Sequence, residues 1–206
     1  MKLYWLCTTK CKHDEEYIQK SLHELNTFLK KPPTKIKIDM QPLCADTAKK
    51  INLILEKGIF NKKKYHVIEG RSFKDKNIYC PLYELYEKIN SLSDCMPLVI
   101  YCEPSSNIAK AIKKTNKIAE WGLCFQHRIS AVYEKNNKYI IWHEVLHLFG
   151  VSDCYDIGNP NGPLTCELEK CLMQYAPQEG NVAPWPFLCK SNIKWLKSAY
   201  KNMEHV

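Results

Sequence analysis

The sequence contains very little arginine. Only Arg71 and Arg128 are arginines among the 30 basic residues, and the others are lysines. Proteins that read base sequence or grip phosphates depend on the bidentate guanidinium group of arginine. The net charge of +8 also belongs to residues 1–120, whereas residues 121–206 are neutral. We therefore interpret the charge as a solvated lysine-rich surface and expect no specific nucleic-acid partner.

Long hydrophobic runs are also missing. The longest, such as residues 98–101 and 139–142, fall far short of the roughly 20 apolar residues that cross a bilayer. The apolar stretch in residues 1–7 is too short for the core of a signal peptide and predicts a buried strand. We therefore expect no membrane partner. A cytoplasmic location is expected, or secretion if a leader was trimmed ahead of residue 1.

Repeats and low-complexity tracts are absent too. The chain has 206 residues, of which 45% are apolar and 11% aromatic, and this composition excludes a disordered or fibrous protein. Up to residue 150 the hydrophobic periodicity predicts strands that alternate with helices. The predicted strands are residues 4–7, 35–40, 65–68, 97–102 and 128–134, and the predicted helices are residues 13–31, 46–57, 81–92, 104–120 and 137–149.

The character of the chain changes after residue 150. Five prolines and three glycines lie within residues 151–187, which predicts a long irregular segment, and residues 189–202 then have the pattern of a closing helix. We expect an α+β protein and a monomer. Residues 1–150 should form a twisted mixed β-sheet with packed helices and an active-site helix. Residues 151–206 should form a small irregular C-terminal subdomain.

The most informative segment is the run HEVLHLFGVSD at residues 143–153. On a helix, His143 and His147 are one turn apart, so both imidazoles project from one face and form a pair suited to zinc. Glu144 is about 100° around the helix from His143. That position places its carboxylate beside a metal rather than on it, where it is suited to take a proton from water.

A third ligand can come from the residues that follow this helix. Gly150 lets the backbone leave the helix in a conformation that residues with a Cβ avoid. The chain can then turn back, so that Asp153 brings its carboxylate to the metal. Two histidines, one aspartate and an open position for water form the arrangement of a catalytic zinc site. If Asp153 is not the ligand, Glu167 and Glu169 are the next candidates.

The alternative is that the two histidines are ordinary helix residues. In a chain of this composition, a His-Glu-x-x-His match arises by chance with a probability of about 0.02. The added Gly150 and Asp153 lower that chance several-hundred-fold, and the run falls on a helix predicted independently. The sequence therefore favours zinc.

These residues carry a family resemblance. The pattern His-Glu-x-x-His-x-x-Gly-x-x-Asp resembles the extended zinc signature of the metzincin metallopeptidases, with the aspartate of the snapalysin type as third ligand. The run CLMQY at residues 171–175 resembles the Met-turn of that clan, and Met173 would be its methionine. By the same resemblance to astacins and serralysins, Tyr175 would stabilise an oxyanion or act as a labile metal ligand.

The cysteines add a closer resemblance, to archaemetzincins. In that family a cysteine after the third ligand, another two residues before the methionine, and a later Cys-x-x-Cys together hold a second zinc. Cys154, Cys171 and Cys189 match three of these positions, and Asn192 stands where the fourth cysteine is expected. Cys166 is an additional cysteine that can take the place of the missing ligand.

Two other states of these four cysteines remain open. The chain has 11 cysteines, an odd number, and in the absence of an export signal reduced thiols or metal ligands are favoured over disulfides. A structural zinc would explain how a segment rich in glycine and proline stays folded. Two disulfides, Cys154–Cys166 and Cys171–Cys189, would explain it equally well in an exported protein, and free thiols are the third possibility.

The resemblance implies a zinc metalloendopeptidase, a hydrolase that acts on peptide or protein substrates. Glu144 would be the general base and Tyr175 would share the developing oxyanion. The strand at residues 128–133 would form the rim of the substrate cleft. A catalytically silent peptide-binding module on the same fold is the first alternative, and the retained Glu144 argues against it. A cysteine-rich redox or metal-handling protein is the second, and the lack of Cys-x-x-Cys pairs argues against it.

Overall fold

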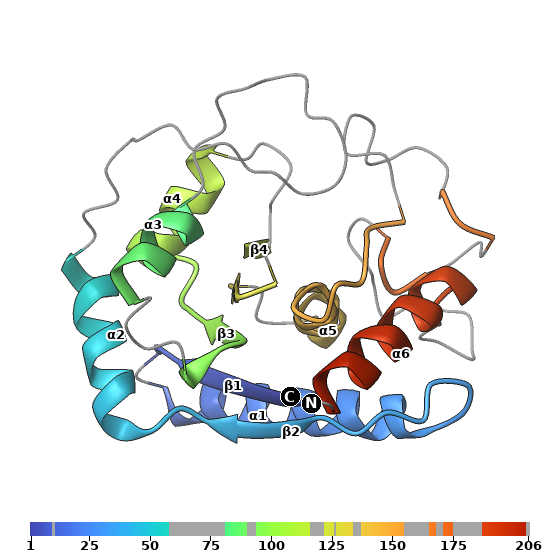
Figure 1. The fold of residues 1–206 in the computed structure, drawn as a ribbon. Coiled ribbons are helices and arrows are strands. Elements are labelled where there is room, and N and C mark those ends of the chain that lie inside the picture. The colour runs from blue at the N-terminus through green and yellow to red at the C-terminus, as the bar shows by residue number, and fades with distance from the viewer. Residues whose placement is uncertain are drawn as a thin grey trace.

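The computed structural model describes residues 1–9, 11–57, 81–89, 94–115, 122–125, 127–133, 137–154, 165–167, 171–174 and 187–204. Helices and strands alternate along most of this part of the chain (Figure 1). The elements are β1 (Lys2–Cys7), α1 (Lys12–Lys30), β2 (Asp39–Pro42), α2 (Ala45–Lys57), α3 (Pro81–Ile89), β3 (Leu98–Tyr101), α4 (Asn107–Thr115), β4 (Gly122–Phe125), β5 (Ile129–Val132), α5 (Lys138–His147) and α6 (Lys190–Glu204).

The described strands form one mixed sheet in the order β2-β1-β3-β5-β4. The first four strands are parallel, and β4 runs antiparallel to β5 at one edge. Tyr4 of β1 is level with Leu98 of β3, which in turn is level with Ile129 of β5. The predicted mixed sheet with packed helices is therefore confirmed.

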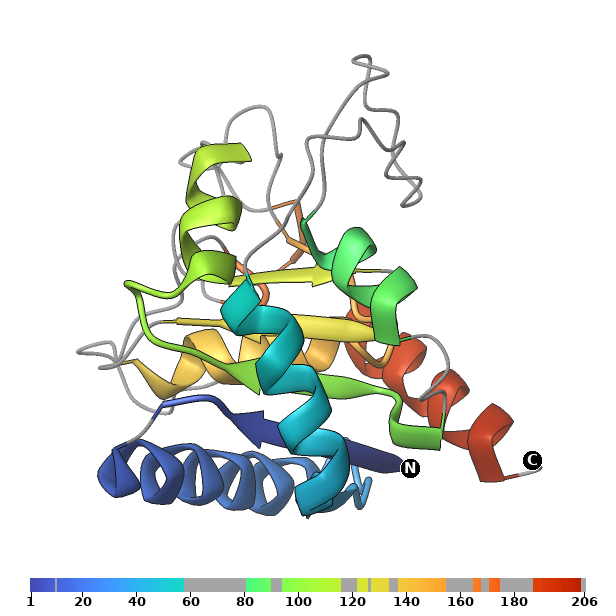
Figure 2. The same ribbon diagram turned by 90° about the vertical axis from the view of Figure 1, so that its left-hand side faces the viewer.

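The helices cover both faces of this sheet, because successive strand side chains point to opposite sides. Val99 and Val132 belong to one core, which also contains residues of α1, α5 and α6. Ile100 and Ala131 belong to the other, with residues of α2, α3 and α4. Figure 2 shows α2, α3 and α4 in front of the strands and α5 behind them. Burial on both faces explains why β3 is apolar throughout.

Helix α5 is the most enclosed helix of the described part, and almost all of its side chains are buried. The side chain of Asn137 caps its N-terminus by accepting a hydrogen bond from the N–H of Tyr139 at 3.0 Å. Trp142 stacks on Phe28 of α1, with 5.6 Å between ring centroids, and donates its indole N–H to the carbonyl of Ser21 at 2.9 Å. These contacts make α5 a fixed platform for the residues that it carries.

One predicted strand differs from the structure, and one observed strand was not predicted. The strand predicted at residues 35–40 is displaced, because β2 begins only at Asp39. Ile36 and Ile38 are buried, so their alternation indicates burial rather than strand pairing. The backbone of Ile38 pairs instead with the side chain of Asn26, through bonds of 2.9 and 3.1 Å. Strand β4 was not predicted at all, and the predicted strand 65–68 lies outside the described residues.

Most of the predicted irregular segment, residues 151–187, also lies outside the described residues. The closing helix is present as α6, close to its predicted bounds. Within the described part of the chain, no helix combines the length and the apolar character that a membrane span requires.

Candidate metal centre

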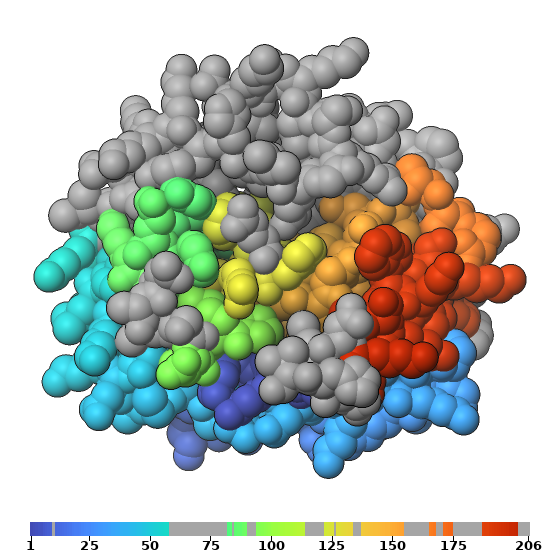
Figure 3. Space-filling view, in the orientation of Figure 1, coloured from blue at the N-terminus to red at the C-terminus, as the bar shows by residue number. Residues whose placement is uncertain are grey.

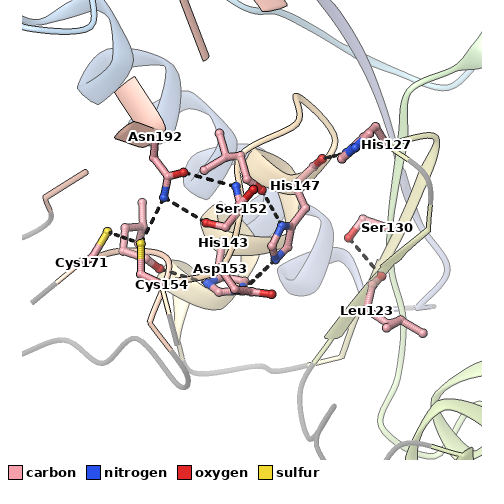
Figure 4. A network of polar contacts seen from close by, with 12 residues as sticks. Leu123, His127, Ser130, His143, His147, Ser152, Asp153, Cys154, Cys171 and Asn192 are labelled. Carbon is pink, nitrogen blue, oxygen red and sulfur yellow. Dashed lines mark hydrogen bonds and ion pairs between the residues drawn. The ribbon is translucent and has the colours of Figure 1, made fainter. Parts of the chain in front are cut away.

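Helix α5 presents two imidazoles to one point. The Nε2 atoms of His143 and His147 lie 3.1 Å apart (Figure 4). Nδ1 of His143 lies 3.0 Å from the carbonyl oxygen of Leu172, and Nδ1 of His147 lies 2.8 Å from that of Val151. Because a carbonyl only accepts, each Nδ1 carries a proton, and in the neutral ring each Nε2 has a free lone pair. Both rings are therefore oriented for metal ligation through Nε2.

Asp153 completes this group after a sharp exit from the helix. Gly150 has φ +80°, and a Cβ there would meet no heavy atom within 4 Å, so the conformation rather than space calls for glycine. The chain then returns, and Oδ1 of Asp153 lies 3.2 Å from Nε2 of His143 and 3.2 Å from Nε2 of His147. We call these three residues the histidine–aspartate triad.

The spacing of the triad fits a tetrahedral zinc ion. Zinc bound at about 2.0–2.1 Å keeps neighbouring ligand atoms about 3.3 Å apart. The three separations here are 3.1, 3.2 and 3.2 Å. The donor set, two imidazoles and one carboxylate, is also one that zinc accepts, and it leaves a fourth position open. On both chemistry and spacing, the residues present fit the metal.

The charged groups in and beside the triad shift one another's pKa values. Burial lowers the pKa of His147, but the charges of Asp153 and Glu144 outweigh burial and raise that pKa to about 10. Burial raises the pKa of Asp153, but the charge of His147 outweighs it and holds that pKa well below its usual range. A metal ion that binds here near neutral pH therefore competes with a proton on His147.

Glu144 lies beside the triad on α5, with only 8% of its surface exposed. Its side chain presses against the backbone of β4. A Cβ on Gly122 would lie 2.7 Å from Cγ and 2.8 Å from Oε1 of Glu144, which is closer than real atoms approach. Only glycine at position 122 leaves room for this carboxylate. The sequence alone did not single out Gly122, which lies just beyond the helix predicted at residues 104–120 and begins β4.

The strand predicted as the rim of the substrate cleft lies inside the sheet. The strand predicted as the rim, residues 128–133, forms β5, which pairs with β3 on one side and β4 on the other. The expectation of a free rim there is therefore wrong. Within the described part of the chain the sheet ends at β4, which contacts α5. His127, in the turn between β4 and β5, hydrogen-bonds the carbonyl oxygen of His147 and ties this edge to the end of α5 (Figure 4).

A second group of ligands lies close by. The sulfur atoms of Cys154, Cys166, Cys171 and Cys189 lie within 4.8 Å of one another, and all four residues are free cysteines. Sγ of Cys154 is 3.6 Å from that of Cys171 and 3.7 Å from that of Cys189. Zinc bound by thiolates at about 2.3 Å separates the sulfurs by about 3.8 Å, whereas a disulfide needs about 2.05 Å. The spacing of this cysteine cluster fits a metal.

Hydrogen bonds and burial give the thiols of the cysteine cluster different pKa values. The Cys154 thiol donates to the Cys171 sulfur, and this bond outweighs burial and lowers the pKa of Cys171 to about 6. The same bond and burial raise the pKa of Cys154. Burial raises the pKa of Cys189 to about 11. The lowered pKa of Cys171 favours its thiolate, the form that binds metals.

A tight turn connects the two groups of ligands. Residues 171–174 form it, closed by a 3.0 Å bond from the N–H of Gln174 to the carbonyl of Cys171. The carbonyl of Leu172 accepts the His143 bond described above, and the carbonyl of Met173 accepts the N–H of Cys154 at 2.8 Å. Met173 is fully buried in the core shared with α5.

The remaining predicted site residues lie elsewhere. Tyr175 and Glu169 fall outside the described residues. Glu167 belongs to neither group, and its carboxylate accepts the backbone N–H of Lys190 at 2.7 Å. The described residues thus place Asp153, and not Glu167, with the two histidines.

Comparison with known proteins adds a likeness to a solved structure. No protein-family model and no curated protein matches this chain. Among solved structures, the fold is similar to that of archaemetzincin from Methanopyrus kandleri, with a TM-score of 0.43 and 12% sequence identity. The match covers 98% of this chain and 96% of that one.

Proposed function

We propose that the protein is a zinc-dependent metallopeptidase that hydrolyses peptide bonds of a peptide or protein substrate. The observation that carries this proposal is the triad of His143, His147 and Asp153 with the buried carboxylate of Glu144 beside it. Two imidazoles, one carboxylate and a neighbouring glutamate are the donor set and the base that metal-assisted hydrolysis needs.

A bound zinc ion would lower the pKa of its water towards about 7 and polarise the scissile carbonyl. The chain's own residues supply the rest. The backbone carbonyls of Leu172 and Val151 hold the imidazole rings in position. The carboxylate of Glu144 takes up the proton of the attacking water and delivers it to the departing amine. The phenol of Tyr175 stabilises the oxyanion as it develops.

The edge of β4 offers a place for the substrate. An extended peptide can add to the free edge of a sheet through main-chain hydrogen bonds. Strand β4 ends the described sheet and contacts α5, which carries the triad and Glu144. We propose that the substrate lies along β4, and that the protein acts as a monomer.

We further propose that the cysteine cluster holds a structural zinc ion and that the turn with Met173 is a Met-turn. The sulfur spacing and the lowered pKa of Cys171 support the first statement. A closed ligand set of four sulfurs has no position for water, so its role would be folding rather than catalysis. The aspartate in the triad, in place of a third histidine, resembles the snapalysin type.

The alternative is a catalytically silent peptide-binding module with the same scaffold. Burial of a carboxylate costs free energy, and a scaffold without chemistry gains nothing from it. Glu144 is buried, and position 122 must be glycine to leave room for it. These observations favour the enzyme.

The test is hydrolysis of a fluorogenic peptide library by the zinc-loaded protein. Wild type should cleave, and Glu144→Gln should lose activity by a factor of about 10²–10⁴ while its zinc content stays the same. Glu167→Gln is the matched control, because Glu167 is an exposed glutamate outside the triad and should leave activity unchanged. Peptide binding without cleavage by wild type would favour the binding module instead.

A further inference from the structure

Asn192 on helix α6 is a buried polar residue, only 3% exposed. Of its apolar neighbours on α6, Leu196 belongs to the core shared with α5, and Ile193 packs against that core. In the space-filling view the surface of α6, in red, adjoins the orange segment that follows α5 (Figure 3). A buried amide without hydrogen-bond partners costs free energy, so the partners of Asn192 indicate why it is there.

All the described bonds of this amide go to one short segment (Figure 4). Nδ2 donates to the carbonyl of Ser152 at 2.9 Å, and Oδ1 accepts the N–H of Ser152 at 3.3 Å. Nδ2 also donates to Sγ of Cys154 at 3.2 Å. Asn192 thus holds both backbone polar groups of Ser152 and, with the same nitrogen, a sulfur of the cysteine cluster.

The segment that it holds is where the two groups of ligands meet. Asp153 belongs to the triad and Cys154 to the cysteine cluster, although they are adjacent in sequence. Residues 151–153 form no regular secondary structure that would fix them. Cys154 has two further backbone bonds, to Met173 and Thr165, whereas Asn192 holds the backbone directly before Asp153.

We propose that Asn192 is a positioning residue that couples the two metal-binding groups. Its N–H bond to the Cys154 sulfur strengthens when that sulfur is a metal-bound thiolate, because hydrogen bonds to charged acceptors are stronger. The same amide then holds Ser152 more firmly, which keeps Oδ1 of Asp153 at the two imidazoles. Coupling of this kind is reciprocal, so each filled site raises the metal affinity of the other. The proposal rests on the proposed function only in that both groups bind metal.

The test measures metal binding rather than catalysis, with Zn²⁺ and Co²⁺ as probes. Chelator competition gives the affinity of each site, and the near-ultraviolet absorption of cobalt thiolates identifies the cysteine site. In wild type, the triad should bind zinc more tightly once the cysteine site is filled. Asn192→Ala and Asn192→Asp should weaken binding at the triad by about 10–100-fold, the usual effect of losing a residue that orients ligands. Both should abolish the coupling.

The variants are chosen to separate positioning from general stability. Asn192→Asp keeps the shape and the acceptor but lacks both N–H donors, whereas Ser191→Ala changes an exposed neighbour on α6 and should match wild type. Loss of the N–H bond should also move the cobalt–thiolate absorption to longer wavelength, because the sulfur becomes a stronger electron donor. A purely structural role would not move that band.

Several results would overturn the proposal. One is triad affinity in Asn192→Asp equal to that of Ser191→Ala, and another is a wild type whose two sites bind metal independently or that holds only one metal. If Asn192→Ala does not fold, the triad affinity of Asn192→Asp and the coupling between the two metal sites in wild type test the proposal instead. Coupled sites in a protein without peptidase activity would support this proposal and contradict the proposed function, so the two fail separately.

Discussion

The two groups of ligands are assembled in opposite ways. Two of the three triad residues stand one turn apart on α5, which is buried and capped independently of them, and Asp153 follows within six residues. The four cysteines are spread over residues 154–189 and lie on a turn, on irregular segments and at the start of α6. A helix preorganises the triad, whereas the cysteine site must be closed by its own ligand bonds. Loss of metal should therefore affect catalysis at the first site and folding at the second.

The largest expected effect is that of His147→Ala. Two remaining ligands cannot hold zinc against a chelator, so the catalytic metal and the activity should both be lost. The cysteine cluster should keep its metal, and zinc analysis should fall from two ions per chain to one. An unchanged zinc content would refute the assignment of the triad.

Cys171→Ser tests whether a metal at the cysteine cluster stabilises the fold. This residue is fully buried and the pKa of its thiol is lowered, so its loss should release the structural metal. The unfolding free energy should fall by several kcal/mol, since loss of a structural metal is among the largest single-residue effects. Limited proteolysis should cut ahead of α6 before it cuts α5. Cys44→Ser, at an exposed cysteine outside the cluster, is the control and should match wild type.

A smaller effect is expected from Gly122→Ala. The new methyl group would crowd Glu144, and overpacking of this kind costs about 1–3 kcal/mol. If the carboxylate moves, kcat should fall about tenfold or more while the zinc content stays the same.

Gly150→Ala is the matched control for that variant. Its φ of +80° is strained for alanine, but a Cβ there meets no atom, so it should lower stability by about 1 kcal/mol rather than displace Glu144. Equal kcat values for the two variants would contradict the role given to Gly122.

The smallest effect is a proton released when the triad binds metal. The pKa of His147 is raised to about 10, so near pH 7 this imidazole carries a proton that the metal must displace. Apparent metal affinity should therefore rise with pH and level off above about pH 10, where the imidazole is already neutral. Calorimetry at pH 7 in buffers of different ionisation enthalpy, on protein whose cysteine cluster is already filled with zinc, should detect one proton released from His147. Release of none at pH 7 would show that His147 is neutral there.

The sign of the matching stability effect in the metal-free chain follows from the same pKa shifts. A raised pKa of His147 contributes stability that is fully present below its unfolded value of about 6.5 and is lost as the pH rises to about 10. A lowered pKa of Asp153 contributes stability that is present above about pH 4 and is lost as the pH falls.

Much of the fold was predictable because its signals are local. The apolar spacing in residues 13–31 and 46–57 predicted α1 and α2 close to their bounds, since a helix shows its buried face every three or four residues. Strand β4 was not predicted, because a strand of four residues carries too little hydrophobic alternation to be recognised from the sequence. The alternation of Ile36 and Ile38 was misinterpreted as a strand. Alternate buried residues give the same sequence pattern whether or not the segment pairs with a neighbouring strand.

The sequence by itself determined which ligand chemistry this protein carries, because the spacing of His143 and His147 on one helix follows from the helical repeat alone. The tertiary structure alone decided that β4 ends the described sheet, that Gly122 lies against Glu144, and that Asn192 holds the segment between the two groups of ligands. The contacts of Gly122 and Asn192 join residues more than 20 positions apart through a close approach or a few hydrogen bonds. They repeat with no period, so only packing of the whole chain brings them together.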